Sequence, residues 1–259
     1  MTEGLTPCAR VKCIAVLAFA ALISICGPVS ATPETSEGLA ATEVLANTKQ
    51  GGVIAATRYG PADASTKVLV IGQMHGDESA GRRVVRALAN RLASGIQLPA
   101  DTAIWLVSTM NPDGARAGTR VNAAGVDLNR NFPQGWRQQG RATETWSGPS
   151  AGSEAETAAM SKFLDRVKPT AVLAFHQPFA VVDITHPASR RAGRVLANWL
   201  ELPARVVGCP GPCYGTLTGW VDDHLAAIAL TVELPQRVSA ARINRSATAV
   251  LRLTRWLAR

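Results

Sequence analysis

The segment Val68-Leu-Val-Ile-Gly-Gln-Met-His-Gly-Asp-Glu78 joins a short apolar run to a polar turn. Its first four residues are of strand length and uninterrupted by polar residues, a pattern that is typical of a strand buried on both faces of a sheet. Along the rest of the chain, segments with helical periodicity alternate with further apolar runs of strand length. The other apolar runs are Ala103–Val107, Ala171–Phe175 and Ala227–Val232, and the helical segments are Ser79–Ala93, Ser153–Val167, Arg190–Leu200 and Val238–Leu257.

This alternation predicts an α/β domain whose sheet is covered by helices on both faces. Ser153 with Glu156 three residues later predicts a capping box at one helix start. The last helix places its arginines on one side and its apolar residues on the other, which we interpret as a solvated face over a packed one. No internal repeat and no second domain are evident.

The composition agrees with one sizeable core. The chain has 259 residues, of which 47% are hydrophobic and 18% charged, with a formal net charge of +8. A chain this apolar is not disordered, and one this long with five cysteines is not a disulfide-rich miniprotein. The basic residues form no run and are not interleaved with aromatic residues, so we expect no nucleic-acid partner.

The N-terminus has the layout of a secretory signal peptide. Arg10 and Lys12 precede an uncharged run over 13–26, and the small residues Val29-Ser30-Ala31 follow. The run is shorter than the ~20 residues of a membrane-spanning helix. We therefore expect residues 1–31 to be removed and the protein to be periplasmic or secreted, without stable membrane insertion. An uncleaved anchor is the alternative.

The mature chain is predicted to begin with a flexible leader over residues 32–50, rich in Thr, Glu, Ser and Ala, ahead of a catalytic domain over 51–259. Two cysteines remain after cleavage, Cys209 and Cys213 in the segment Cys-Pro-Gly-Pro-Cys. In an oxidising compartment we expect them to form a disulfide. The alternative is a pair of metal ligands, for which no second cysteine pair exists.

Polar residues follow two of the predicted strands. His75 and Glu78 come after the first apolar run, and His176 comes directly after Ala171–Phe175. Ligands of open α/β sheets bind beyond the carboxyl ends of the strands, so these three side chains are expected to converge. Two histidines and one glutamate form a zinc site that leaves one position open, which is the arrangement of a catalytic centre. His186 and His224 are interpreted as surface or loop residues without a role.

Further polar motifs lie between and after these ligands, in a fixed order. They are His75-Gly-Asp-Glu78, Asn111-Pro-Asp-Gly114, Gly125-Val-Asp-Leu-Asn-Arg-Asn-Phe-Pro133, Trp146-Ser-Gly-Pro149, Phe175-His176 and Thr231-Val-Glu-Leu-Pro235. Together they resemble the zinc carboxypeptidase family, in particular its murein peptide amidase-like branch. The resemblance runs from about residue 68 to 235. It implies a single domain with a mixed, mostly parallel twisted sheet, and one Zn²⁺ per chain held by His75, Glu78 and His176.

The resemblance also implies roles for residues around the metal. Asp127 would orient a ligand histidine, as carboxylates often do. Arg120 would polarise the scissile carbonyl and stabilise the oxyanion. Asn129 and Arg130 would bind a carboxylate of the leaving residue, for which the planar guanidinium is suited. The ordinary interpretations are a solvated arginine and an asparagine that serves a turn.

Glu233 ends the apolar run Ala227–Val232, where a carboxylate is expected to be poorly solvated. The resemblance implies that Glu233 is the general base, which takes a proton from the attacking water and returns it to the leaving amine. The structural alternative is a glutamate in an ion pair at a strand end.

The resemblance is less clear where the leaving residue would bind. Digestive-type members close this pocket with a mobile tyrosine, and here Tyr214 follows the Cys209–Cys213 loop at an offset that does not match. We therefore expect Tyr214 to contact substrate without a catalytic role. Leu217 falls near the pocket floor. An apolar floor would suit an aliphatic chain better than the charged end of diaminopimelate, the residue that the murein peptide amidase-like branch releases. The Gln177–Pro178 bond is predicted to be cis.

We therefore predict an exported zinc enzyme that is a monomer. The resemblance implies that it cleaves the bond between γ-D-glutamate and diaminopimelate in cell-wall peptides. One alternative is a general carboxypeptidase that releases C-terminal residues. Another is an N-acyl amino acid amidohydrolase of the succinylglutamate desuccinylase type, although those enzymes are mostly cytosolic. A catalytically inactive binding protein is disfavoured because all the chemical residues are present together.

Overall fold

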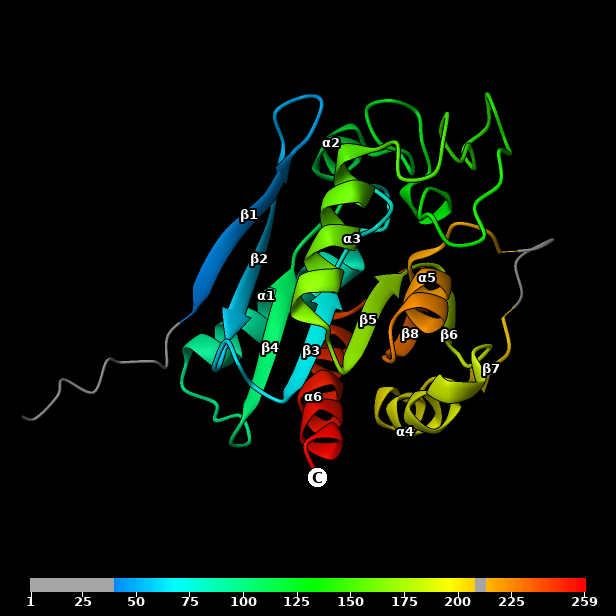
Figure 1. The fold of residues 1–259 in the computed structure, drawn as a ribbon. Coiled ribbons are helices and arrows are strands. Elements are labelled where there is room, and N and C mark those ends of the chain that lie inside the picture. The colour runs from blue at the N-terminus through cyan, green and yellow to red at the C-terminus, as the bar shows by residue number, and fades with distance from the viewer. Residues whose placement is uncertain (1–39, 208–212) are drawn as a thin grey trace, which may run out of the picture. The chain divides into compact units, whose positions relative to one another are not determined.

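The long apolar runs form the middle of an eight-stranded twisted sheet in the computed structural model of the chain (Figure 1). The strand order is β1-β2-β4-β3-β5-β8-β6-β7, and the central strands β4, β3, β5 and β8 are parallel. The outer pairs β1 with β2, β2 with β4 and β6 with β8 are antiparallel. The strands are β1 Ala41–Asn47, β2 Val53–Tyr59, β3 Thr66–Ile71, β4 Thr102–Val107, β5 Ala171–His176, β6 Phe179–Asp183, β7 Ala204–Arg205 and β8 Ile228–Pro235.

The structure describes residues 40–207 and 213–259, which belong to one compact unit. The predicted signal peptide, its cleavage after Ala31 and the predicted half-cystine Cys209 lie outside the described residues. Within the described ranges, no helix is both long enough and apolar enough to cross a membrane.

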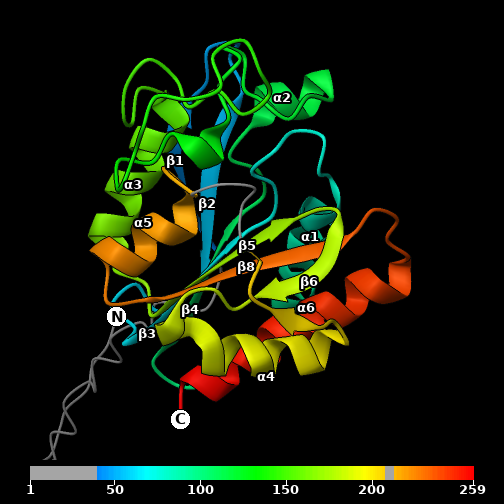
Figure 2. The same ribbon diagram turned by 90° about the vertical axis from the view of Figure 1, so that its right-hand side faces the viewer.

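Helices cover both faces of the sheet (Figures 1 and 2). Helices α1, α4 and α6 pack on one face, and α3 and α5 pack on the other. The alternation of side chains along β3 fills both layers, because Val68 and Val70 belong to the first core and Leu69 and Ile71 to the second. The helices are α1 Ala80–Ala93, α2 Pro112–Ala117, α3 Ala155–Val167, α4 Arg190–Leu200, α5 Leu217–His224 and α6 Ala240–Leu257.

Burial on both faces explains why the central strands are so apolar. Every residue of β4 and of β5 is buried, and each fully buried Val, Leu or Ile side chain stabilises the fold by ~1.5–3 kcal/mol relative to an exposed one. The predicted α/β sheet with helices on both faces is confirmed, and so are the four predicted strands and four predicted helices, to within a few residues at their ends.

The prediction of a flexible leader over residues 32–50 is wrong for its second half, because β1 occupies Ala41–Asn47 at the edge of the sheet. Its side chains are mostly exposed or half-buried, so the sequence has no apolar run there. The strand forms because it pairs with β2, and Arg166 of α3 adds an ion pair to Glu43 at 2.6 Å.

The predicted capping box is also wrong. Helix α3 begins at Ala155 with Glu154 as N-cap, and no side chain caps it. Ser153 instead donates a hydrogen bond to the Glu154 carboxylate at 2.8 Å, while Glu156 accepts one from the Asn122 amide. Asn122, which is distant in sequence, therefore binds the Glu156 carboxylate that a capping box would have used.

Gly81 allows α1 to approach the ends of β3 and β5 very closely. A Cβ atom on Gly81 would lie 1.7 Å from the Gly72 carbonyl oxygen and 2.6 Å from Phe175 Cβ. No larger residue fits without moving the helix. This contact fixes the turn between β3 and α1, which carries His75 and Glu78.

Candidate metal centre and active-site cleft

The carboxyl ends of three neighbouring strands bring the predicted ligands and base together. His75 and Glu78 lie in the turn after β3, and His176 is the last residue of β5, the parallel neighbour of β3. On the other side of β5, Glu233 of β8 is the register partner of His176. These four residues thus lie at one edge of the sheet, and His75, Glu78 and His176 converge there as expected from their positions after two apolar runs.

The turn that presents His75 and Glu78 is held by its own hydrogen bonds. The Gln73 side chain donates to the Gly76 carbonyl at 2.6 Å, and the Glu78 N–H donates to the His75 carbonyl at 3.1 Å. The Gly76 N–H donates to the Arg120 carbonyl at 3.3 Å. The turn is therefore tied to the loop that carries the other polar motifs.

His75, Glu78 and His176 have the geometry of a metal centre. All three are buried, and one possible ligand atom from each lies within 4.8 Å of the others. The two Nδ1 atoms are 3.2 Å apart, and the Glu78 oxygens lie 2.8 Å from His75 Nδ1 and 2.9 Å from His176 Nδ1. Tetrahedral bonds of ~2.0–2.1 Å give ligand separations of roughly 3.3–3.4 Å, so the set fits zinc after small movements.

Asp127 fixes the orientation of one predicted ligand, His75. Its carboxylate is fully buried and accepts a hydrogen bond from His75 Nε2 at 3.2 Å. In the neutral imidazole this bond places the proton on Nε2, so that Nδ1 keeps its lone pair and faces the other two residues of the set. The position agrees with the role that the family resemblance implies for Asp127.

Charges around the ligands shift their pKa values in opposite directions. Burial alone would raise the pKa of Glu78, but hydrogen bonds and attraction from His176 and His75 outweigh it and hold that pKa far below its ordinary value. Burial would lower the pKa of His75, yet contacts with Asp127 and Glu78 raise it. Glu78 is thus ionised at neutral pH, which is the form that binds a metal.

Arg120 lies beside the ligands and is held by the same buried carboxylate. Its Nη2 and Nε donate to Asp127 at 2.8 and 3.1 Å. Its Nη1 lies 3.2 Å from His75 Nδ1 and 3.5 Å from Glu78 Oε1. The guanidinium lines the cleft, where a positive charge can stabilise negative charge that develops on a substrate oxygen.

Asn129 and Arg130 lie in a short 3-10 helix, Leu128–Arg130, whose first N–H groups Asp127 caps. The Asn129 side-chain oxygen accepts from the Leu217 N–H at 2.9 Å and ties this loop to the start of α5. Arg130 donates to the Asn129 carbonyl at 2.8 Å, and both residues line the cleft. Burial lowers the pKa of Arg130, which remains a cation at every physiological pH.

Glu233 has an oxygen without a partner. Its Oε2 is buried and accepts no hydrogen bond from any described residue. Burial raises the pKa of Glu233; His176 opposes this shift, and the nearby charge of Glu78 adds to it. A buried carboxylate oxygen without a donor is costly, and the Glu233 side chain lines the cleft, where its carboxylate can exchange a proton with a bound molecule.

A cleft of about 720 Å³ opens over these groups. The polar wall of this cleft was not predicted from the sequence. Thr231, a polar residue inside an apolar run, is a signal for it, whereas His186 was interpreted as a surface or loop residue without a role. His186 Nδ1 is 3.0 Å from Asp222 Oδ2, so α5 orients the ring. Besides the ligands and Glu233, the residues lining the cleft include Phe179, Asp183, Thr185, His186, Thr216, Thr218 and Thr231.

Two predicted substrate contacts are not among the residues that line the cleft. Leu217 is 1% exposed and packs in the core beneath α3 and α5, while its neighbours Thr216 and Thr218 form the wall. The half-buried Tyr214 lies under Arg137, whose guanidinium carbon is 4.2 Å from the ring centroid. Neighbouring residues at the start of a helix point in different directions. A prediction that is wrong by one position therefore names a buried residue in place of one that lines the cleft.

Two smaller predictions concern covalent structure. The Gln177–Pro178 bond is cis, as predicted. Cys213 is disulfide-bonded and lines the cleft. Because Cys209 lies outside the described residues, the pairing of these two cysteines stays a prediction.

The relatives found by comparison with known proteins agree with the family that the sequence motifs indicated. Residues 40–190 match the zinc carboxypeptidase family. The chain is 31% identical over 209 residues to murein peptide amidase A of Escherichia coli K12, covering 76% of this chain and 82% of that protein.

Solved structures agree with this result. The crystal structure of murein-tripeptide amidase from Escherichia coli O157 has a TM-score of 0.65 at 26% identity, covering 86% of this chain and 96% of that one. Bovine thrombin-activatable fibrinolysis inhibitor has a TM-score of 0.75 at 15% identity, with 86% and 92% covered, and shows the shared fold.

Proposed function

The chain belongs to the zinc carboxypeptidase family of hydrolases, and from this premise we propose that it removes the terminal diaminopimelate residue from cell-wall peptides. The proposed bond is the amide between γ-D-glutamate and diaminopimelate. The observation that carries the proposal is the convergence of His75, Glu78 and His176 with the carboxylate residue Glu233 in one cleft. Murein peptide amidase A is similar over most of both chains, which supports this substrate class.

In this proposal His75, Glu78 and His176 hold one Zn²⁺. The donor set fits, because two imidazole nitrogens and an ionised carboxylate are the ligands of many catalytic zinc sites. When bound, zinc polarises a substrate carbonyl and lowers the pKa of a water molecule from ~15.7 toward ~7.

Glu233 is the proposed proton carrier. Its carboxylate, on the wall of the cleft, accepts the proton of the attacking water, and the resulting carboxylic acid then donates that proton to the amine that leaves. The raised pKa of Glu233 helps both steps, because it makes the carboxylate a better base and keeps the proton available for transfer.

Two arginines that line the cleft would bind the negatively charged groups of the substrate and of the tetrahedral intermediate. Arg120 is held rigidly by Asp127 and faces the ligand set, where it would stabilise the oxyanion. Arg130, with Asn129, would bind the carboxylate of the leaving residue, since a guanidinium forms paired hydrogen bonds with a carboxylate.

The polar wall supports a leaving residue with a polar side chain. Four threonines and His186 line the cleft where an apolar floor was expected from Leu217. Diaminopimelate carries an ammonium and a carboxylate at the end of its side chain, and both need hydrogen-bonding partners when they are buried. An aliphatic leaving residue would form no hydrogen bonds with these groups.

The direct test is an assay with matched peptides. The mature enzyme is incubated with L-Ala-γ-D-Glu-diaminopimelate, with the same tripeptide in α linkage, and with a γ-linked tripeptide ending in lysine, and products are identified by mass. Release of diaminopimelate from the γ-linked substrate alone supports the proposal. Equal cleavage of α-linked peptides would identify a general carboxypeptidase instead.

Export is part of the same proposal and has a separate test. The layout of residues 1–31 predicts a mature chain that begins at Thr32. N-terminal sequencing of the protein recovered from the cell envelope should read Thr-Pro-Glu-Thr. An intact N-terminal methionine would contradict cleavage.

A further inference from the structure

The charged residues of the helical layer formed by α1, α4 and α6 are all of one sign. The three helices contain eleven arginines, no lysine, and no aspartate or glutamate. They pack side by side over one face of the sheet, so charges that are up to 173 residues apart in sequence share one surface. The arginines are Arg82, Arg83, Arg86 and Arg91 of α1, Arg190, Arg191 and Arg194 of α4, and Arg242, Arg245, Arg252 and Arg255 of α6.

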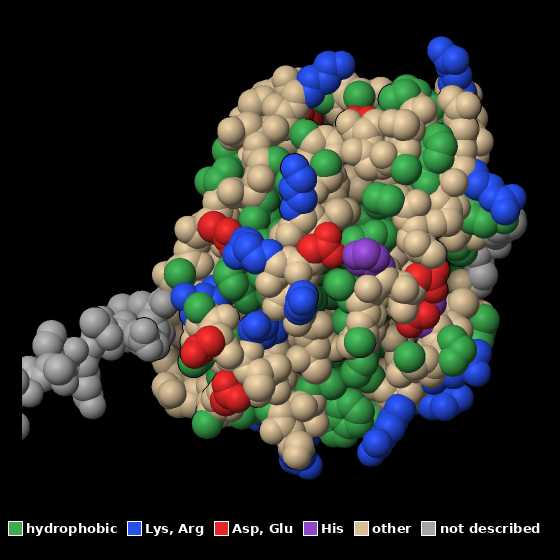
Figure 3. All heavy atoms as spheres, in the orientation of Figure 1, with side chains coloured by type: hydrophobic (Ala, Val, Ile, Leu, Met, Phe, Trp, Pro, Cys, Tyr) green, Lys and Arg blue, Asp and Glu red, His purple; other side chains and the backbone are tan. Residues whose placement is uncertain are grey.

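The helices on the other face differ. Helices α3 and α5 contain four carboxylates and only two cations, Lys162 and Arg166. On the face over α3, acidic and basic side chains are intermixed (Figure 3). The positive charge is therefore a property of the α1, α4 and α6 layer and not of the whole surface.

Little within the described residues neutralises the charge of this layer. Its one ion pair there joins Arg245 to Glu201 at 2.5 Å. Other arginines bond to neutral groups: Arg91 donates to the Thr248 hydroxyl at 2.6 Å, and Arg83 to the Val238 carbonyl at 3.1 Å. Such bonds fix the side chains between helices and leave their charge in place.

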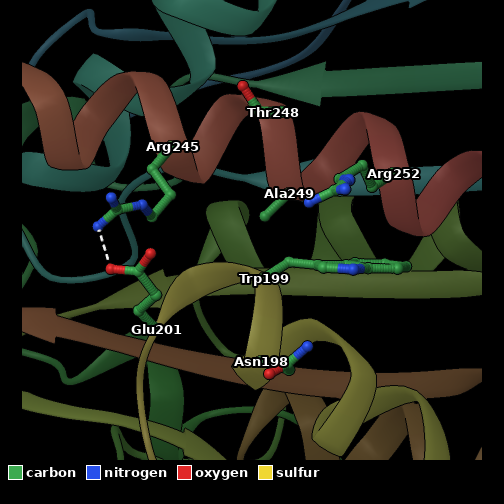
Figure 4. Close-up of a pocket in the computed structure, with 7 residues that line it drawn as sticks. All are labelled: Asn198, Trp199, Glu201, Arg245, Thr248, Ala249 and Arg252. Carbon is green, nitrogen blue, oxygen red and sulfur yellow. Dashed lines mark ion pairs between the residues drawn. The ribbon is translucent and has the colours of Figure 1, made fainter.

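Tryptophans lie among these arginines. The Arg252 guanidinium carbon is 5.5 Å from the ring centroid of Trp199, and that of Arg191 is 5.3 Å from the centroid of Trp256. Both tryptophans are half-buried. Trp199, Arg252 and Arg245 line an open hollow of about 470 Å³ between α4 and α6 (Figure 4).

We propose that the α1, α4 and α6 layer docks the enzyme on the surface of an anionic phospholipid bilayer. Arginine forms paired hydrogen bonds with phosphate, and tryptophan is enriched at the headgroup level of membranes. The layer is broad, since α6 alone has 18 residues and is ~27 Å long, and neighbouring helices lie ~8–10 Å apart. A broad layer of helix sides matches a plane better than it matches the groove of a nucleic acid.

Docking through this layer leaves the active-site cleft accessible. None of the residues that line the cleft belongs to α1, α4 or α6. The cleft lies at the carboxyl edge of the sheet, and the basic layer covers one of its faces. The proposal does not depend on the identity of the substrate.

The test measures vesicle binding by the full chain after signal removal. Vesicles of phosphatidylcholine with 30% phosphatidylglycerol are compared with pure phosphatidylcholine by co-sedimentation at low and high salt. In the test variant, Arg82, Arg86 and Arg194 are changed to glutamine; all three are exposed and form no ion pair with a described residue. In the matched control, three exposed lysines outside the layer are changed to glutamine, namely Lys49, Lys162 and Lys168.

We expect the wild-type chain to bind the anionic vesicles and to be released by salt, with little binding to neutral vesicles. Each arginine near the surface contributes roughly fivefold, so the test variant should lose on the order of a hundredfold in binding. The control should change less than a few-fold, and both variants should keep wild-type peptidase activity.

Three results would overturn the proposal. One is equal binding to neutral and anionic vesicles, and another is an equal loss in the test and control variants, which would indicate net charge alone. The third is salt-sensitive binding to duplex DNA by a chain that does not bind the anionic vesicles, because this would assign the layer to another class of partner.

Discussion

Changing Asp127 to asparagine should lower the affinity for zinc by about 10- to 100-fold, or ~1.4–2.7 kcal/mol, in a chain that still folds. The carboxylate accepts four hydrogen bonds. Its Oδ1 accepts from His75 Nε2 at 3.2 Å and from the Asn129 N–H at 2.9 Å. Its Oδ2 accepts from Arg120 Nη2 at 2.8 Å and from Nε at 3.1 Å.

An asparagine cannot reproduce this pattern in either orientation. If its oxygen faces His75, its NH₂ group faces the donors of Arg120, and the guanidinium loses its place in the cleft. If its NH₂ group faces His75, the ring must carry its proton on Nδ1, and that nitrogen can no longer bind the metal. In both orientations the negative charge behind His75 is lost, so the imidazole becomes a weaker ligand.

The assay is competition for zinc with a chromophoric chelator at neutral pH, together with thermal unfolding. Asp113→Asn is the matched control. Asp113 is also buried and also bonds to an arginine, Arg116, at 2.5 Å, but it contacts none of the proposed ligands. It should cost stability without changing zinc affinity. Wild-type affinity in a folded Asp127→Asn chain, or an equal loss in both variants, would refute the reasoning.

Other predictions follow from the same cleft. Glu233→Gln should reduce kcat by ~10²–10⁴-fold with zinc content unchanged by elemental analysis; an undiminished rate would remove this residue from the mechanism. Since Glu233 acts when ionised and burial raises its pKa above 4.5, kcat/KM should fall as the pH drops through a value above 4.5, and a limb at a lower pH would contradict this assignment. Arg130→Ala should weaken substrates with a free terminal carboxylate by about tenfold or more, and amidated substrates little, as judged by KM. Gly81→Ala should destabilise the fold by ~1–3 kcal/mol or more in urea unfolding, because its Cβ would overlap the Gly72 carbonyl; an unchanged midpoint would contradict this packing.

Several features of this protein were determined by the local sequence. The central strands β3, β4, β5 and β8 are buried on both faces, so each needs a continuous apolar run that is visible without the fold. The positions of His75, Glu78, His176 and Glu233 at the carboxyl ends of those strands followed from the chain order alone, because parallel strands end at one edge.

Other features depended on contacts between distant segments. Strand β1 is half-exposed and gains its order from β2, so its sequence resembles a loop. The polar cleft wall includes Thr218 in place of Leu217, because the packing of α5 decides which residue faces the core.

The basic layer is the clearest case of this kind. The arginines of α6 alone indicated an ordinary solvated face. The strand order and the packing of the helices place α1 and α4 beside α6, and only then do the arginines of all three helices add to one surface. Burial patterns can be predicted from the order of residues along the chain, whereas the sum of charges over a surface depends on which elements are neighbours in space.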